Sequence, residues 1–192
     1  MELTFSIARS SANAAEICGD VAKGWLLSDR AVIAIADGLG HGADAALAAG
    51  RAIEYVGSHL GEDPVSLFRG MGSALTSTRG AAVGLAVVRQ GSGELTYAGV
   101  GNTRAAVFGW RTTRLDGDVG IVGGGFRRLA PVVVPIRPGD YLALWTDGLD
   151  ERLALAKAGH EEDIDRLAEA LLRRYSSGHD DACLILARCS VS

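Results

Sequence analysis

The chain has 192 residues, of which 48% are hydrophobic and 22% are charged, and its formal net charge is −4. This length suits one domain with a full core and is short for two, so we expect a single domain over residues 1–192. The acidic balance, without any block of lysine and arginine, argues against nucleic acid or an anionic membrane as the main partner.

The cysteines and the apolar runs favour a cytoplasmic protein. The three cysteines show no CxxC spacing, which argues against a disulfide framework or a zinc site, and Cys18 and Cys183 suit structural roles. The longest apolar runs, such as residues 81–88, are well short of the ~18 residues that a membrane span needs. The N-terminus carries an early acidic residue and no signal pattern.

Strands are followed by helices in the first part of the chain. Short apolar runs predict strands at residues 3–8, 24–28 and 31–36. A single apolar stripe predicts a helix over residues 43–60. Asp63 as a cap and Pro64 at the first helical position predict a second helix over residues 64–78.

Consecutive strands occupy the middle of the chain. Between residues 81 and 116, apolar segments alternate with glycine-containing turns, which is typical of an antiparallel meander. Residues 116–128 have five glycines and no period, which predicts a mobile loop. Residues 141–148 form another apolar run that ends in Asp-Gly.

A helix and a strand complete the pattern. Apolar residues from Ile164 to Tyr175 recur on one helical face, and residues 182–188 predict a final strand. This order of elements predicts an α+β fold in which helices cover the faces of the sheets.

Four aspartates stand where a predicted strand meets a loop: Asp20, Asp37, Asp147 and Asp180. Such positions let a rigid scaffold hold a ligand. If the four carboxylates converged, each would raise the pKa of the others unless a cation lay among them, and oxygen ligands suit Mg²⁺ or Mn²⁺. An Asp-Gly pair after a strand is also common in plain turns, as we expect for Asp116-Gly117, so the residues alone leave both interpretations open.

The ordered motifs resemble those of the type 2C metal-dependent protein serine/threonine phosphatases, in their bacterial SpoIIE/RsbU/RsbX branch. The resemblance covers nearly the whole chain and rests on these segments in order: CGD (18–20), ADGLGHGADAA (36–46), IRPGDYLALWTDGLDE (136–151) and HDDACLILA (179–187). Because little sequence flanks these motifs, we expect a compact phosphatase most similar to the stand-alone RsbX type.

This resemblance implies a four-layer α-β-β-α sandwich of two mainly antiparallel sheets flanked by helices. It further implies that Asp37 bridges two Mn²⁺ or Mg²⁺ ions and that the Gly38 carbonyl is a further ligand. Asp147 and Asp180 would bind one of the ions, and Asp20 would assist directly or through water. Asp181 would support these ligands from behind.

The implied activity is removal of phosphate from serine or threonine by a water that the metal ions activate. The implied substrate is a phosphorylated regulatory protein of a stressosome or partner-switching pathway. A phosphatase-like module that docks a regulator without efficient catalysis, and a phosphatase of small phosphoesters, are the alternatives.

Several residues depart from the pattern of the wider type 2C family. Gly19 stands where an acidic residue often precedes the first aspartate, and no basic phosphate-binding residue is evident upstream, since Arg9 is too far away. His41 lies four residues after Asp37 instead of two, which leaves open a general-acid role and a role in helix capping or turn support.

Three further features near the motifs remain open. Arg79 and Asn102 suit either substrate contact or turn formation, and His179 suits support or solvation. The glycine-rich segment 120–125 lacks the spacing of a nucleotide-binding loop, and the resemblance suggests instead a flexible edge that a partner touches.

Overall fold

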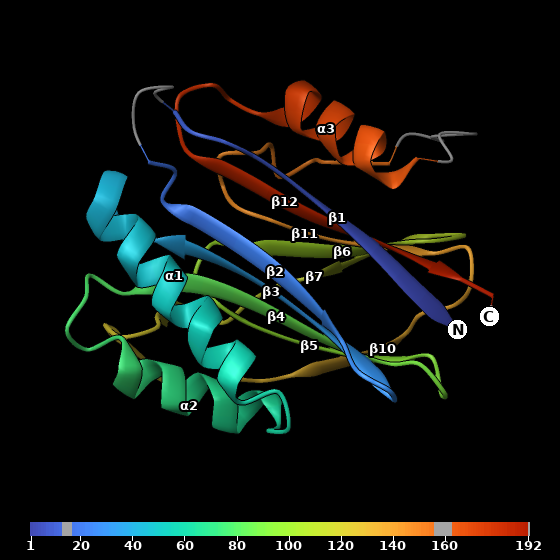
Figure 1. Cartoon of the computed structure of the whole chain (residues 1–192), viewed down its shortest axis with the longest axis horizontal. Helices are drawn as coiled ribbons and strands as arrows, with labels where there is room; N and C mark the ends of the chain where they lie inside the picture. Colours follow the sequence, from blue (N-terminus) through green and yellow to red (C-terminus); the bar gives the residue numbers. More distant parts are fainter. Residues whose placement is uncertain (13–16, 156–162, 192) are drawn as a thin grey trace.

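Two five-stranded antiparallel sheets lie face to face between helices in the computed structural model of this chain (Figure 1). The structure describes residues 1–12, 17–155 and 163–191. The first sheet has the strand order β1 (Glu2–Ser10), β12 (Ala182–Ser190), β11 (Tyr141–Trp145), β6 (Arg104–Phe108), β7 (Thr112–Leu115). The second has the order β10 (Val132–Pro135), β5 (Glu94–Val100), β4 (Ala81–Arg89), β3 (Arg30–Gly38), β2 (Asp20–Leu26).

Helices cover the outer face of each sheet. Helices α1 (Gly42–Ser58) and α2 (Pro64–Ala74) lie on the second sheet, and α3 (Ile164–Tyr175) lies on the first (Figure 1). This arrangement confirms the predicted α+β class and the four layers of the α-β-β-α sandwich.

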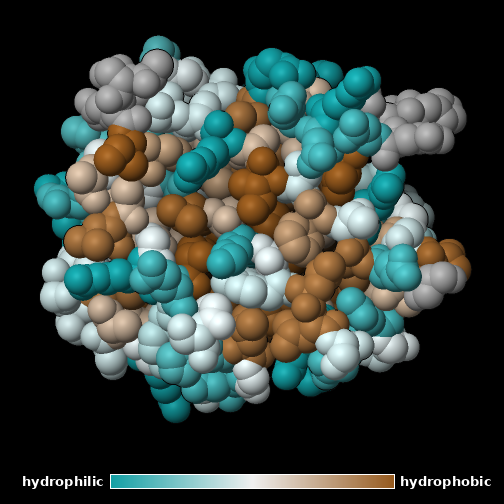
Figure 2. Space-filling view, viewed as in Figure 1, coloured by the Kyte–Doolittle hydropathy of each residue, from teal (hydrophilic) through white to brown (hydrophobic). Residues whose placement is uncertain are grey.

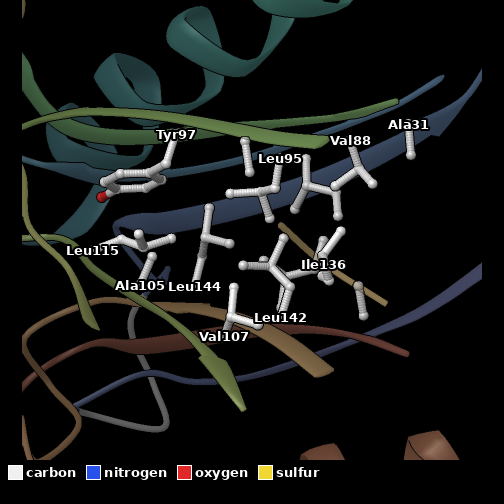
Figure 3. Close-up of a cluster of buried hydrophobic side chains, with 14 of the residues drawn as sticks. Ala31, Val88, Leu95, Tyr97, Ala105, Val107, Leu115, Ile136, Leu142 and Leu144 are labelled. Atoms are coloured by element: carbon white, nitrogen blue, oxygen red, sulfur yellow. The ribbon is translucent and has the colours of Figure 1, made fainter. Parts of the chain in front are cut away.

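Three apolar layers hold the sandwich together. Figure 3 shows the layer between the sheets, where Leu95 of β5 and Leu142 and Leu144 of β11 meet. Strand β3 serves two layers, because Ile33 faces the other sheet while Val32 packs against the helices. A strand buried on both faces needs apolar residues at consecutive positions, which explains the unbroken run in β3.

The hydrophobic surface in Figure 2 lies across the middle of the face that β1 and β2 form. Each is an edge strand of its sheet, and Ile7 on β1 and Leu26 on β2 are exposed. The more hydrophilic surface in this view lies over α3.

The helix predictions are confirmed, with one boundary corrected. Asp63 caps α2, since its side chain accepts hydrogen bonds from the backbone N–H groups of Val65 and Ser66, but the helix ends at Ala74 and not at residue 78. The reason is local, because the Thr78 hydroxyl and backbone N–H both donate to the Leu75 carbonyl and form a turn there.

The strand predictions need two corrections. The strand expected at residues 24–28 begins earlier, at Asp20. The strands between residues 81 and 116 do not form one meander, because β4 and β5 belong to the second sheet while β6 and β7 belong to the first. The chain crosses between the sheets just after β5, where Gly101 adopts φ +97°.

The predicted mobile loop at residues 116–128 contains regular structure. Strands β8 (Gly120–Ile121) and β9 (Gly125–Phe126) pair with each other. The segment is attached to the second sheet, since Val122 pairs with Ala81 and the backbone of Asp118 exchanges hydrogen bonds with Gly99 and Gly101. These bonds place the segment beside the ends of β4 and β5.

Candidate functional site

The strand ends bring the predicted aspartates to one end of the sandwich. Asp20 and Asp37 are direct partners in the pairing of β2 with β3. Asp147 follows β11 and Asp180 precedes β12, and these two strands are neighbours in the other sheet. A cavity of about 580 Å³ opens there, and Asp37, Asp147 and Asp180 line it.

The carboxyl groups disturb one another's ionisation. Burial raises the pKa of Asp37 to about 8, and the charges of Asp20, Asp147 and Asp180 act in the same direction. Burial also raises the pKa of Asp20 to about 7, although a hydrogen bond with Thr146 partly offsets this effect. The pKa of Asp147 is raised by burial and by the charge of Asp180. The direction of these shifts agrees with the lining of the cavity, whose described residues include neither arginine nor lysine.

Asp20 is the most deeply placed of the four. The residue is only 2% exposed, and its Oδ2 atom is buried without a hydrogen-bond partner among the described residues. A buried carboxylate oxygen without a donor is costly, and a cation would relieve that cost. The donor set consists of carboxylate oxygens, which fits a hard divalent ion such as Mg²⁺ or Mn²⁺.

These carboxylates are not a preassembled coordination shell. Across residues 1–12, 17–155 and 163–191, no group of three or more His, Cys, Asp or Glu side chains is arranged so that it could hold a metal ion. Mutual repulsion favours such a spread arrangement, so cation binding requires these side chains to converge.

The glycines that follow Asp37 and Asp147 are required by close backbone packing. A Cβ atom on Gly38 would lie 1.9 Å from the Ala45 carbonyl oxygen of α1, and one on Gly148 would lie 2.0 Å from the Asp181 carbonyl oxygen. Close packing of Gly38 against Ala45 is by itself a sufficient reason for glycine at this position, whether or not its carbonyl also binds an ion. The two glycines let α1 and the 180–181 segment pack directly against the aspartate-bearing loops.

Asp181 holds the segment before β2 in place. Its Oδ2 accepts a hydrogen bond of 2.6 Å from the Gly19 backbone N–H, and its Oδ1 accepts one of 2.9 Å from Ala12. Gly19 is also tightly enclosed, because a Cβ there would lie 2.9 Å from the Ala45 Cβ. Asp181 thus connects the end of β12 with the strand that carries Asp20.

Asn102 belongs to the site, although its sequence context suited a turn equally well. Its Nδ2 donates a 2.7 Å hydrogen bond to Asp147 Oδ2, and the residue lines the cavity. The signal in the sequence was a polar residue directly after a strand, but its partner lies 45 residues away. Pairing between such distant segments is decided by the arrangement of the sheets.

His41 lies at the cavity and precedes α1. It is the N-cap residue of that helix, and its side chain makes no capping hydrogen bond. The imidazole therefore does not cap α1, and proton transfer and turn support are the roles left for it. His179, in contrast, is exposed and does not line the cavity.

The mouth of the cavity is apolar. Leu39 and Val119 line it and remain 50% and 94% exposed, and Ile121 lies beside them. Val119 and Ile121 belong to the segment 116–128, so the expectation that this segment forms an edge of the site agrees with its position.

Comparison with known proteins identifies a family and a fold. The model of the family described as stage II sporulation protein E (SpoIIE) matches residues 28–190. No curated protein matches the sequence.

Solved structures share the whole architecture. One similar structure is 26% identical in sequence and has a TM-score of 0.93, and the match covers 98% of this chain and 100% of the other. It is described as "The bacterial stressosome: a modular system that has been adapted to control secondary messenger signaling". RsbX in complex with magnesium is 21% identical with a TM-score of 0.83, over 98% and 96%.

A third similar structure contains the type 2C phosphatase domain of SpoIIE from Bacillus subtilis. It is 20% identical with a TM-score of 0.84, over 98% of this chain and 62% of the other. The fold is therefore that of type 2C phosphatases.

In the described part of the chain, no helix has the length and apolar character needed to cross a membrane.

Proposed function

Since this chain belongs to the SpoIIE family, we propose that it is a metal-dependent protein serine/threonine phosphatase formed by a single domain. The observation that carries the proposal is that Asp37, Asp147 and Asp180 line one cavity and that their charges, with that of the buried Asp20, act on one another. A cluster of carboxylates with raised pKa values destabilises a fold unless it binds something positive, so its retention favours a metal-binding role.

Five residues would hold Mg²⁺ or Mn²⁺ in this cavity: Asp20, Asp37, Gly38 through its carbonyl, Asp147 and Asp180. When bound, such ions supply Lewis-acid chemistry that activates water and neutralises charge on a phosphoryl group. Asn102 orients the Asp147 carboxylate for this task through its hydrogen bond. Asp181 holds Gly19, and hence the start of β2 with Asp20, close to the start of β12.

His41 is the residue of the cavity suited to proton transfer. Hydrolysis adds water to phosphorus and breaks the bond between phosphorus and the serine or threonine Oγ, which must then take up a proton. An imidazolium at His41 would donate that proton, and the neutral imidazole would recover it from solvent.

A protein substrate is favoured by the surroundings of the cavity. Leu39 and Val119 offer exposed apolar surface around an acidic floor, and a segment of a protein can cover such surface while a small phosphoester cannot. Together with the likeness to RsbX and to a stressosome-related structure, this supports a phosphorylated regulatory protein of a stress-response pathway in the cytoplasm as substrate.

The test is hydrolysis of p-nitrophenyl phosphate and of a phosphorylated partner protein by the purified chain, titrated with Mn²⁺ or Mg²⁺ and then with EDTA. We expect metal-dependent turnover that falls at least about 1000-fold in Asp37→Asn and Asp147→Asn, because each removes a charged ligand. Asp29→Asn is the matched control, since exposed Asp29 lies at the opposite end of β3 from Asp37. Full activity in Asp37→Asn would contradict the proposal.

A docking module without catalysis is the second candidate, and the absence of a preassembled coordination shell among the described residues is the observation that favours it. It predicts that the partner binds equally well with and without metal and that its phosphorylation is unchanged after hours with Mn²⁺.

A further inference from the structure

The cavity presents negative charge to a ligand that is itself negative. A phosphate monoester carries about −1.5 to −2 charges at neutral pH. The described residues that line the cavity include three aspartates but neither arginine nor lysine. A cationic side chain at the edge of the cavity would therefore contribute strongly to binding.

Arg79 lies at that edge. Its guanidinium covers Gly40, a residue that lines the cavity, and a Cβ atom built on Gly40 would lie only 2.9 Å from Arg79 Nη1. Gly40 also has φ +96°, a conformation that glycine adopts most readily. The absence of a side chain at Gly40 leaves room for the guanidinium beside the cavity.

The backbone of Arg79 is fixed relative to the aspartates. The next residue, Gly80, accepts a 3.0 Å hydrogen bond from Leu39 N–H, two residues after Asp37. Gly80 also packs against the segment 116–128, because a Cβ atom on Gly80 would lie 2.6 Å from Ile121 Cγ2. The arginine therefore extends from a turn before β4 that contacts both the end of β3 and the segment carrying Ile121.

Asp44 orients the guanidinium. Arg79 Nη2 donates a 2.7 Å hydrogen bond to Asp44 Oδ2, in the first turn of α1. The pair is exposed, with 53% of the arginine side chain and 65% of the aspartate side chain accessible, so it adds little stability. Within the described residues this is the one hydrogen bond of the guanidinium, which leaves N–H groups available to an anion.

We propose that Arg79 binds the non-bridging phosphate oxygens of the substrate at the mouth of the cavity and that Asp44 positions it. A planar guanidinium matches phosphate oxygens with two parallel hydrogen bonds. This assignment rests on the proposed phosphatase function and adds to it a substrate-binding residue that lies about 40 residues from Asp37 in the chain.

Steady-state kinetics with p-nitrophenyl phosphate and inhibition by inorganic phosphate test the assignment. We expect Arg79→Gln to raise KM and the inhibition constant for phosphate about 10- to 100-fold with a smaller change in kcat, since a hydrogen bond to a charged group contributes that much binding. Arg79→Lys keeps the charge but loses the two-pronged contact, so we expect an intermediate value.

Arg89→Gln is the matched control. Arg89 ends the strand that begins just after Arg79, and it forms a similarly exposed ion pair with Glu94. If wild type is active and the two glutamine variants have equal KM and phosphate inhibition constants, the assignment of Arg79 is wrong while the phosphatase proposal stands.

Direct binding of inorganic phosphate, measured by titration calorimetry with Mg²⁺ present, separates the two proposals. If wild type lacks turnover, the phosphatase proposal fails, and binding that Arg79→Gln weakens still supports the anion site. Phosphate binding that is absent, or unchanged in Arg79→Gln, overturns the assignment.

Discussion

At the scale of single residues, Asp20 and Asp37 carry the largest electrostatic cost in the site. They face each other across β2 and β3, and burial raises their pKa values to about 7 and about 8. An unfolded aspartate has a pKa of about 3.9. Between about pH 4 and pH 8 the folded, metal-free protein therefore holds more protons than the unfolded chain, and its free energy of unfolding falls as pH rises.

The fall in stability with rising pH can be measured in the presence of EDTA, which keeps the protein free of metal. We expect the melting temperature of wild type to fall more between pH 5 and pH 8.5 than that of Asp37→Asn, which lacks one of the two groups. Each kcal/mol corresponds to about 2–4 °C for a chain of this length, so the difference is a matter of several degrees. If scanning calorimetry gave parallel pH profiles of melting temperature for wild type and Asp37→Asn, the raised pKa of Asp37 would be contradicted.

Val119 offers a second prediction at this scale. Its side chain is 94% exposed at the cavity mouth, so a protein substrate can bury it. We expect Val119→Ser to lower kcat/KM for a phosphoprotein about 10-fold, because burial of valine contributes about 1.5 kcal/mol, and to leave p-nitrophenyl phosphate hydrolysis unchanged. Val133→Ser, on the distant strand β10, is the control, and an equal loss on both substrates in Val119→Ser would oppose the prediction.

At the scale of elements, the site is held by loops that pack backbone against backbone. Gly148 lets the loop after β11 touch the segment before β12. Gly50, inside α1, is free of such a constraint, because a Cβ atom there would meet nothing within 4 Å beyond its own helix backbone. The two glycines therefore differ in what a side chain at each position would disturb.

Replacement by alanine should separate these two cases. We expect Gly148→Ala to lower stability by about 1–3 kcal/mol, because the methyl group would force the Asp147 and Asp181 segments apart. We expect Gly50→Ala to raise stability by about 0.5–1 kcal/mol, because alanine favours the helix. Urea unfolding of both variants checks the pair, and equal effects would show that backbone contact at Gly148 is unimportant.

At the scale of the whole molecule, the proposed ligands come from both sheets. Asp20 and Asp37 belong to one sheet, while Asp147 and Asp180 flank strands of the other. The apolar layer between the sheets sets their separation. A bound cation would therefore connect two layers that otherwise meet through apolar contacts.

Thermal unfolding with and without metal tests this connection. We expect Mn²⁺ at 100 times its Kd to stabilise wild type by about 2.7 kcal/mol in one cooperative transition, and EDTA to reverse the effect. Asp147→Asn should lose most of this gain. A gain that persists in Asp147→Asn would mean that the metal binds elsewhere.

Local patterns in the sequence determined the elements and the kinds of residue at their ends. The spacing of apolar residues predicted α3 with its observed bounds, and Asp63 with Pro64 predicted the start of α2. The ordered motifs predicted the family and the four-layer fold. The helices and their caps depend on neighbouring residues, so a single stretch of chain contains that information. The family and the fold came instead from the resemblance of ordered motifs along nearly the whole chain.

Only the tertiary structure decided which residues meet. The crossing of the chain between sheets after β5 brings Asn102 to Asp147, and the turn before β4 brings Arg79 to Gly40 and Asp44. Neither contact could be read from spacing, because each depends on strand register and on the packing of layers formed by distant segments. The physical reason is that side-chain type is a local property, whereas convergence at a cavity is a property of the whole packed sandwich.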